Sequence, residues 1–167
     1  MENHILSVLV RNSSGVLARI AGLFSRRGFN IDSLTVGSTE NKEISRMTIA
    51  LTGNEDVLEQ FTKQLNKLED VLKIYKLKSE NSVYRELVLI KVQAPPEKRG
   101  EINELVTIFR CKVIDVAQET LTIELTGDES KISALIELMN SYGIVEMVRT
   151  GVTALERGDN DITKYGD

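Results

Sequence analysis

The sequence predicts an α+β fold made of two βαββαβ units in succession, and three observations support this. Strand-like and helical apolar patterns alternate in the order strand, helix, strand, strand, helix, strand, and this order occurs twice within 167 residues. Residues 47–55 align with residues 121–129 at an offset of 74 residues. The same offset pairs Phe61 with Leu135, although strand-turn-helix segments can also converge on similar patterns. The order is that of the ferredoxin-like fold, a four-stranded antiparallel sheet with two helices on one face.

In the first half, short elements follow one another closely. We expect strands at 4–10, 29–36, 44–51 and 71–77, with helices at 16–27 and after Asn54. The inward stripe of the first helix is expected at i, i+3, i+4 and i+7, which gives Leu17, Ile20, Ala21 and Phe24. Gly28 suits a left-handed C-cap, and Asn54 suits an N-cap.

In the second half, the pattern restarts after a polar linker. We expect strands at 86–93, 112–116, 121–125 and 144–148. Pro95 and Pro96 indicate the start of one helix, and Asp128 is the expected N-cap of the other. The predicted boundaries are a first domain at 1–78, a linker at 79–83, a second domain at 84–158 and a tail at 159–167. The polar residues from Gly151 onward are expected to be frayed.

The composition excludes several classes of protein. Apolar residues make up 41% and charged residues 28%, which is typical of soluble globular chains. The net charge of −4 gives no basic footprint for nucleic acid. No apolar run reaches the roughly 18 residues of a membrane span, and the start of the chain leaves no room for a signal peptide. With Cys111 as the only cysteine, there can be no intramolecular disulfide. We therefore expect a cytoplasmic protein, with small cores that an oligomer would enlarge.

The turn between the first strand and the first helix is the candidate binding site. No charged residue lies between Asn12 and Leu17. Ser14 is the expected N-cap, and Gly15 would let a ligand approach the backbone closely. The free N–H groups of a helix start favour an anion such as a carboxylate. The turn could hold a small zwitterion without reacting with it, but on this evidence alone a plain connection remains the alternative.

No set of residues suggests catalysis or metal binding. His4 is the only histidine and has no motif around it, and Cys111 has no partner for activation. Phosphate-binding glycine motifs are absent. His4 and Cys111 are both expected to be structural. We therefore expect no catalytic site, no metal site and no cofactor in this chain.

Asn12 and Asn30 are the remaining polar candidates. Asn12 ends the first strand and Asn30 begins the second, after the crossover helix. If the two strands are parallel, these amides lie at opposite ends of the sheet and cannot share a small ligand within one subunit. A two-fold dimer could bring Asn30 of one chain to Asn12 and Gly15 of the other. The alternative is that both asparagines are ordinary turn residues.

Residues 12–19, 23–34 and 45–48 together resemble the signature of the regulatory small subunit of acetohydroxyacid synthase, also called acetolactate synthase. The resemblance is dense across 3–78, which would be an ACT domain, and looser across 84–158. Pro95-Pro96 and the lysine-rich fourth strand depart from the family pattern, which leaves the partner surface of the second domain open.

The resemblance implies a non-catalytic subunit of branched-chain amino acid biosynthesis (valine, isoleucine and leucine). Such a subunit forms a homodimer, activates the catalytic large subunit and confers feedback inhibition, usually by valine. It has no cofactor of its own, whereas the catalytic partner uses thiamine diphosphate, Mg and FAD. The implied effector-binding residues, between the ACT domains of two chains, are Asn12, Gly15, Val16, Leu17, Asn30 and Ile31. The alternatives are a stand-alone amino-acid-sensing module that regulates another enzyme or a transcription factor, and a small enzyme on the same scaffold.

Overall fold

The computed structural model describes residues 2–163 and contains two compact units. The first unit comprises the chain up to Val83 together with the segment from Val152 onward, and the second comprises Tyr84–Gly151. The expected boundary kept residues 84–158 together. In the structure, the chain returns to the first unit at Val152.

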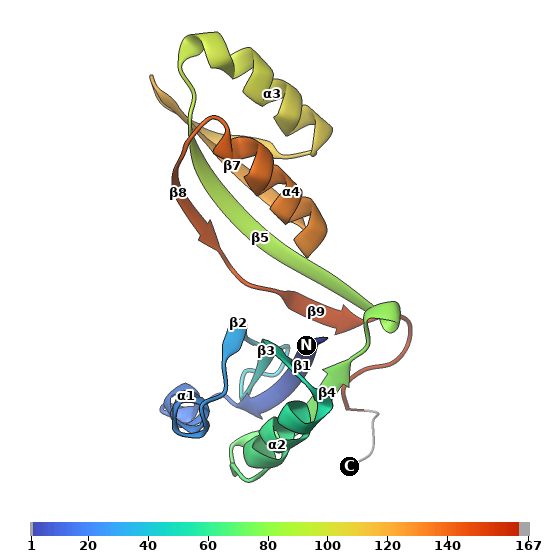
Figure 1. The fold of residues 1–167 in the computed structure, drawn as a ribbon. Coiled ribbons are helices and arrows are strands. Elements are labelled where there is room, and N and C mark those ends of the chain that lie inside the picture. The colour runs from blue at the N-terminus through green and yellow to red at the C-terminus, as the bar shows by residue number, and fades with distance from the viewer. Residues whose placement is uncertain (1, 164–167) are drawn as a thin grey trace. The chain divides into compact units, whose positions relative to one another are not determined.

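The elements of the first unit are β1 (Glu2–Arg11), α1 (Val16–Arg27), β2 (Ile31–Ser38), β3 (Ile44–Gly53), α2 (Glu55–Asn66), β4 (Val71–Leu77), the 3₁₀ turn η1 (Ser79–Asn81) and β9 (Thr153–Glu156). Those of the second unit are β5 (Ser82–Gln93, which begins in the first unit), η2 (Pro96–Lys98), α3 (Arg99–Ile108), β6 (Lys112–Val116), β7 (Thr120–Gly127), α4 (Glu129–Asn140) and β8 (Ile144–Arg149). Figure 1 traces these elements along the chain.

Both units have the predicted ferredoxin-like topology. The strand order is β2-β3-β1-β4 in the first sheet and β6-β7-β5-β8 in the second, and neighbouring strands in both orders are antiparallel. Strand β9 also pairs with β5. Strands β1 and β2 both pair with β3 in antiparallel fashion, so they run parallel to each other with β3 between them. The α+β fold class with two βαββαβ arrangements is therefore confirmed.

The core of the first unit lies between its sheet and the helices α1 and α2. Alternate residues of β1 and β3, such as Val8 and Ile49, are fully buried there, as strands with one face on a helix layer require. The Phe61 ring of α2 stacks on the Phe24 ring, with 4.9 Å between the ring centroids. It packs edge-to-face with the Phe29 ring, with 5.0 Å between the centroids. The second core repeats the plan with aliphatic side chains.

The inward face of α1 differs from the prediction. Ile20 and Phe24 are buried as expected, but Leu17 is 50% exposed and Ala21 is exposed as well. Val16 and Leu23 are buried in their place. Both sets have helical spacing, and the sheet beneath the helix selects the one that packs. The prediction was wrong at two of its four positions.

The predicted helix ends are largely correct. Asn54 caps α2 by accepting from the Val57 N–H at 2.9 Å, and Gly28 ends α1 in the left-handed region with φ 67°. The expected helix start at Pro95-Pro96 is only the 3₁₀ turn η2, and α3 begins at Arg99. The expected linker is η1 followed directly by β5, which starts at Ser82 rather than at residue 86.

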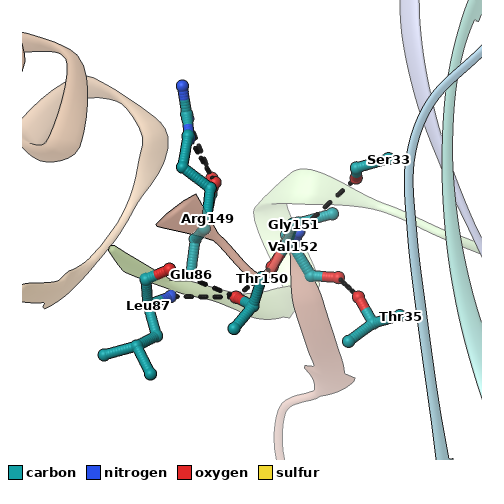
Figure 2. Close-up of polar contacts among 8 residues, drawn as sticks. All are labelled: Ser33, Thr35, Glu86, Leu87, Arg149, Thr150, Gly151 and Val152. Atoms are coloured by element: carbon teal, nitrogen blue, oxygen red, sulfur yellow. Dashed lines mark hydrogen bonds and ion pairs between the residues drawn. The ribbon is translucent and has the colours of Figure 1, made fainter. Parts of the chain in front are cut away.

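We expected the residues from Gly151 onward to be frayed, and this prediction is wrong for the described residues beyond 151. Residues 152–163, which we call the return segment, contain β9 and bury Ala154 and Ile162. Thr35 Oγ1 donates to the Val152 carbonyl at 2.5 Å, and Ser33 Oγ accepts from the Val152 N–H at 3.4 Å (Figure 2). At the other end of β9, the Arg157 N–H donates to the Asn81 carbonyl at 2.7 Å. Side-chain composition concealed this strand, because its stability depends on contacts with residues far away in the sequence.

Candidate functional site

The opening turn between β1 and α1 differs from the prediction in its cap. Gly15, with φ 86°, is the N-cap of α1, and no side chain among residues 2–163 caps this helix start. Ser14 is therefore not the cap that we expected. Positive φ is costly for residues that carry a Cβ, so the turn depends on glycine at this position. The N–H groups that a capping side chain would satisfy are left for solvent or for a ligand.

A cation stands beside this helix start. The Arg19 guanidinium binds Asp70, with Nε 2.7 Å from Oδ2. Its Nη1 lies 3.0 Å from where a Cβ on Gly15 would be. Because Asp70 already pairs with Arg19, the preference of the turn for an anion comes from the helix dipole and the N–H groups of the first turn.

The two apolar residues of the turn have different environments. Val16 is only 4% exposed and packs into the first core, so its side chain is not available to a ligand in this structure. The Leu17 side chain is half exposed on the outer surface of α1. The Val16 N–H also donates to the Ser13 carbonyl, in a long bond of 3.5 Å, so a ligand at the helix start would have to compete for it. The side chain of Leu17 is open to such a ligand.

Asn12 is held by the loop between β2 and β3. Its Nδ2 donates to the Lys42 carbonyl at 2.8 Å, and its backbone N–H donates to the Glu43 carbonyl at 2.7 Å. Within the described chain, its Oδ1 has no hydrogen-bond donor. A side-chain amide oxygen without a donor can accept a hydrogen bond from an ammonium group.

Asn30 and Ile31 lie at the far end of the sheet from Asn12, as the parallel arrangement predicts. Arg11, next to Asn12, pairs with Ile44 of β3, whereas Ile31 pairs with Leu51. At roughly 3.3 Å per residue, the seven positions between Ile44 and Leu51 correspond to about 23 Å. The structure therefore does not bring the six predicted residues together within one chain. Asn30 is exposed and Ile31 is half-buried.

The two residues that we expected to be structural lie in structural environments. His4 is buried and its Nε2 donates to the Gly53 carbonyl at 3.2 Å. Cys111 packs beside the second core, where desolvation raises the pKa of its thiol and so disfavours the reactive thiolate. Ligand atoms of Glu2, His4 and Glu55 lie within 4.8 Å of one another, but the Lys76 ammonium already binds Glu55 at 2.7 Å.

The sequence did not reveal a cavity on the opposite face of the first sheet. It has a volume of about 800 Å³ and lies between the sheet and the return segment. Arg46 of β3, Thr35 of β2 and Ile162 of the return segment are among the residues that line it. Arg46, which alternates with apolar residues in β3, was the available signal in the sequence. The return segment that covers this face was instead expected to be a frayed tail.

Comparisons with known proteins cover both units. A model of the small subunit of acetolactate synthase matches residues 85–158, and a model of the AHAS small subunit-like ACT domain matches residues 6–73. A probable acetolactate synthase small subunit of Archaeoglobus fulgidus is 58% identical over 93% of this chain and 98% of its own length. The chain belongs to the family of acetolactate synthase small subunits. The small subunit of Mycolicibacterium smegmatis is 54% identical, over 95% of this chain and 94% of its own.

A solved structure supports the same membership. The crystal structure of the acetolactate synthase small subunit from Thermotoga maritima has a TM-score of 0.89 and 43% identity, and the match covers 96% of this chain and 100% of that one. Membership in this family makes the chain a small, regulatory subunit with an ACT domain, which implies a catalytic large subunit as partner. In the described part of the chain, no helix is both long and apolar enough to cross a membrane.

Proposed function

We propose that this acetolactate synthase small subunit activates the catalytic subunit and makes it sensitive to inhibition by valine, which binds between the ACT domains of two chains. The proposed effector residues are Asn12, Gly15, Val16, Leu17, Asn30 and Ile31. The observation that carries the proposal is the start of α1 at Gly15, which has no side-chain cap among residues 2–163. It lies beside Asn12, whose side-chain amide oxygen has no donor in the described chain.

Each group of a free amino acid has a matching partner in this arrangement. The backbone N–H groups at the start of α1 receive the carboxylate, and the amide oxygens of Asn12 and Asn30 accept from the ammonium. The exposed side chain of Leu17 and the half-buried side chain of Ile31 contact the apolar side chain of the effector.

The separation between Asn12 and Asn30 supports a site that two chains share. A ligand the size of valine cannot bridge about 23 Å along one sheet. In a two-fold dimer, Asn30 of each chain approaches the opening turn of the other, so effector binding changes the geometry of the pair. Coupling free energies of about 1–3 kcal/mol are typical of such regulation, and they change an affinity about 5- to 150-fold.

The test is reconstitution with the catalytic subunit, with activity measured against valine concentration. We expect Asn30→His and Gly15→Asp to retain activation and to raise the valine concentration for half-inhibition at least about tenfold. Asn103→His and Gly158→Asp are matched controls, because Asn103 is exposed in α3 and Gly158 is an exposed glycine that also has a positive φ. A Cβ on Gly158 would meet no atom within 4 Å, so this control carries the backbone strain of Gly15→Asp without a clash.

Two outcomes would contradict the proposal. Full valine sensitivity in either Asn30→His or Gly15→Asp would show that the site assignment is wrong. If the wild-type chain failed to stimulate the catalytic subunit, the chain would instead be a sensing module for a different partner. Co-purification from native lysate would then identify that partner.

A further inference from the structure

We propose that the cavity beneath the return segment binds a small organic monocarboxylate, and that Arg46 binds its carboxylate. The cavity lies on the face of the first sheet opposite α1 and α2, and residues of one chain line it. It is separate from the proposed effector residues, none of which lines it.

Arg46 lines this cavity and has a buried donor without an acceptor in the described part of the chain. Its Nε is buried and has no hydrogen-bond acceptor among residues 2–163. Within that range, no carboxylate oxygen lies within 4.0 Å of its guanidinium. The Nε–H and an adjacent Nη–H form a planar pair of donors that matches the two oxygens of a carboxylate. A carboxylate at this edge would satisfy the donor that the protein leaves unpaired.

The cost of burying this guanidinium gives the site its preference for an anion. Burial lowers the pKa of Arg46 by desolvation, and the charge of Glu40 raises it in part. An arginine side chain remains protonated in proteins, so a partly desolvated positive charge faces the cavity. Buried charges are normally paired, and a ligand anion would provide the pairing.

The rest of the lining selects the body of the ligand. Leu9, Ile44, Leu155 and Ile162 contribute apolar surface, which suits a short hydrocarbon chain. Glu40 and Asp161 also line the cavity, and their negative charges oppose every anion, most strongly a dicarboxylate or a phosphate dianion. The carboxylate of a monoanion must therefore lie against Arg46. The volume of about 800 Å³ lies in the range typical of small-molecule sites. A monocarboxylate with an apolar body therefore fits best.

Gly37 leaves the space beside the guanidinium open. It pairs with Arg46 across β2 and β3, so a side chain at residue 37 would project from the same face of the sheet. A Cβ built on Gly37 would meet no atom within 4 Å. Gly37→Val would therefore occupy the site without a clash, and valine is well tolerated in strands.

The test is a titration of the full-length chain with isovalerate, in which binding is monitored through amide chemical shifts in ¹H–¹⁵N NMR spectra. We expect saturable shifts concentrated in residues 35–48 and in the return segment. Isovaleramide has the same shape without the charge, so we expect it to bind at least about tenfold more weakly. Inorganic phosphate is the second probe, and we expect it to cause no saturable shifts at these residues.

Variants separate this site from a non-specific effect. We expect Arg46→Gln to weaken isovalerate binding at least about tenfold, and Arg46→Lys to weaken it less, because the lysine keeps the charge and loses the planar pair of donors. Gly37→Val should abolish binding while the melting temperature stays within about 2 °C of wild type. Arg85→Gln is the matched control on an exposed arginine and should bind as wild type. Gly15→Asp should also bind isovalerate normally.

The proposal is overturned if isovalerate causes no saturable shifts, or if isovaleramide binds equally well. Preferential binding of phosphate would also overturn it, as would unchanged binding in Arg46→Gln. Because valine inhibition is measured separately with the catalytic subunit, loss of either site leaves the other proposal standing.

Discussion

Both units begin with a strand that leads into a helix, but the two connections differ. In the second unit, Arg99 at the start of α3 reaches back, with Nε donating to the Ala94 carbonyl at 2.9 Å and Nη2 donating to the Gln118 carbonyl at 2.6 Å. Nη2 also donates to the Ala117 carbonyl. In the first unit, Asn12 makes one comparable bond to Lys42. Within the described residues, neither α1 nor α3 has a side-chain cap, but only α1 begins at a left-handed glycine.

The difference shows where one fold has room for a ligand. The second turn uses its own side chain to satisfy neighbouring carbonyls, which holds it closed. The first turn has no such arginine, and the left-handed glycine at its N-cap, with φ 86°, brings no side chain over the helix start. A repeat in sequence and topology therefore does not imply a repeated binding site.

Among the substitutions that test this comparison, Arg99→Ala should have the largest effect on the free energy of unfolding. Removing a charged donor from three carbonyls should lower the free energy of unfolding by about 1.5–3 kcal/mol. Chemical denaturation would measure the change, with Arg85→Ala as the control because Arg85 is exposed. A loss as small as in the control would mean that the second turn is not held by Arg99.

The second prediction concerns a position at which the two units agree. Asn54 caps α2 and Asp128 caps α4, each by accepting from a backbone N–H at 2.9 Å. Asn54→Ala should reduce the free energy of unfolding by about 1 kcal/mol, and Asn54→Asp should retain most of the cap. Thermal unfolding of the two variants would compare them. Equal losses would rule out the capping bond as the cause.

The smallest expected effect is a pH dependence confined to the second unit. The hydrogen bond from the Lys131 N–H lowers the pKa of Asp128 below its ordinary value of 3.8, and the Ser130 hydroxyl adds to this. A carboxyl with a depressed pKa stabilises the fold above its unfolded pKa, and this contribution is lost as the pH falls through the folded pKa. Acid unfolding should therefore show that the advantage of wild type over Asp128→Ala shrinks below about pH 4.

The matched variant at the same cap is Asp128→Asn, which should keep its stability relative to Asp128→Ala as the pH falls. The amide of asparagine accepts the same hydrogen bond but does not titrate. Identical pH profiles for Asp128→Asn and wild type would contradict an ionised cap.

Much of the fold could be predicted because its signals are local. The caps at Asn54 and Asp128, the left-handed Gly28 and the period of the strands follow from residues close together in the sequence. The stripe on α1 could not be predicted fully, because Leu17 and Leu23 both fit a helical period and only packing on the sheet separates them. The cap at Ser14 failed because the turn places a left-handed glycine at the N-cap instead.

The candidate sites divide in the same way. Gly15 and Asn12 stood out in the sequence because a glycine and an amide near a helix start have a local physical meaning. The cavity at Arg46 could not be recognised in the sequence, because the return segment that covers it is more than 100 residues away in the chain.

The sequence by itself determined the order of elements, the two-fold repetition of the βαββαβ plan and most helix ends, because each depends on side-chain type and spacing within a few residues. Only the tertiary structure decided that the segment beyond Gly151 returns to the first unit, and that Asn12 and Asn30 stand at opposite ends of the first sheet. Those outcomes depend on strand register and long-range burial, for which free energy is gained only when distant parts of the chain meet.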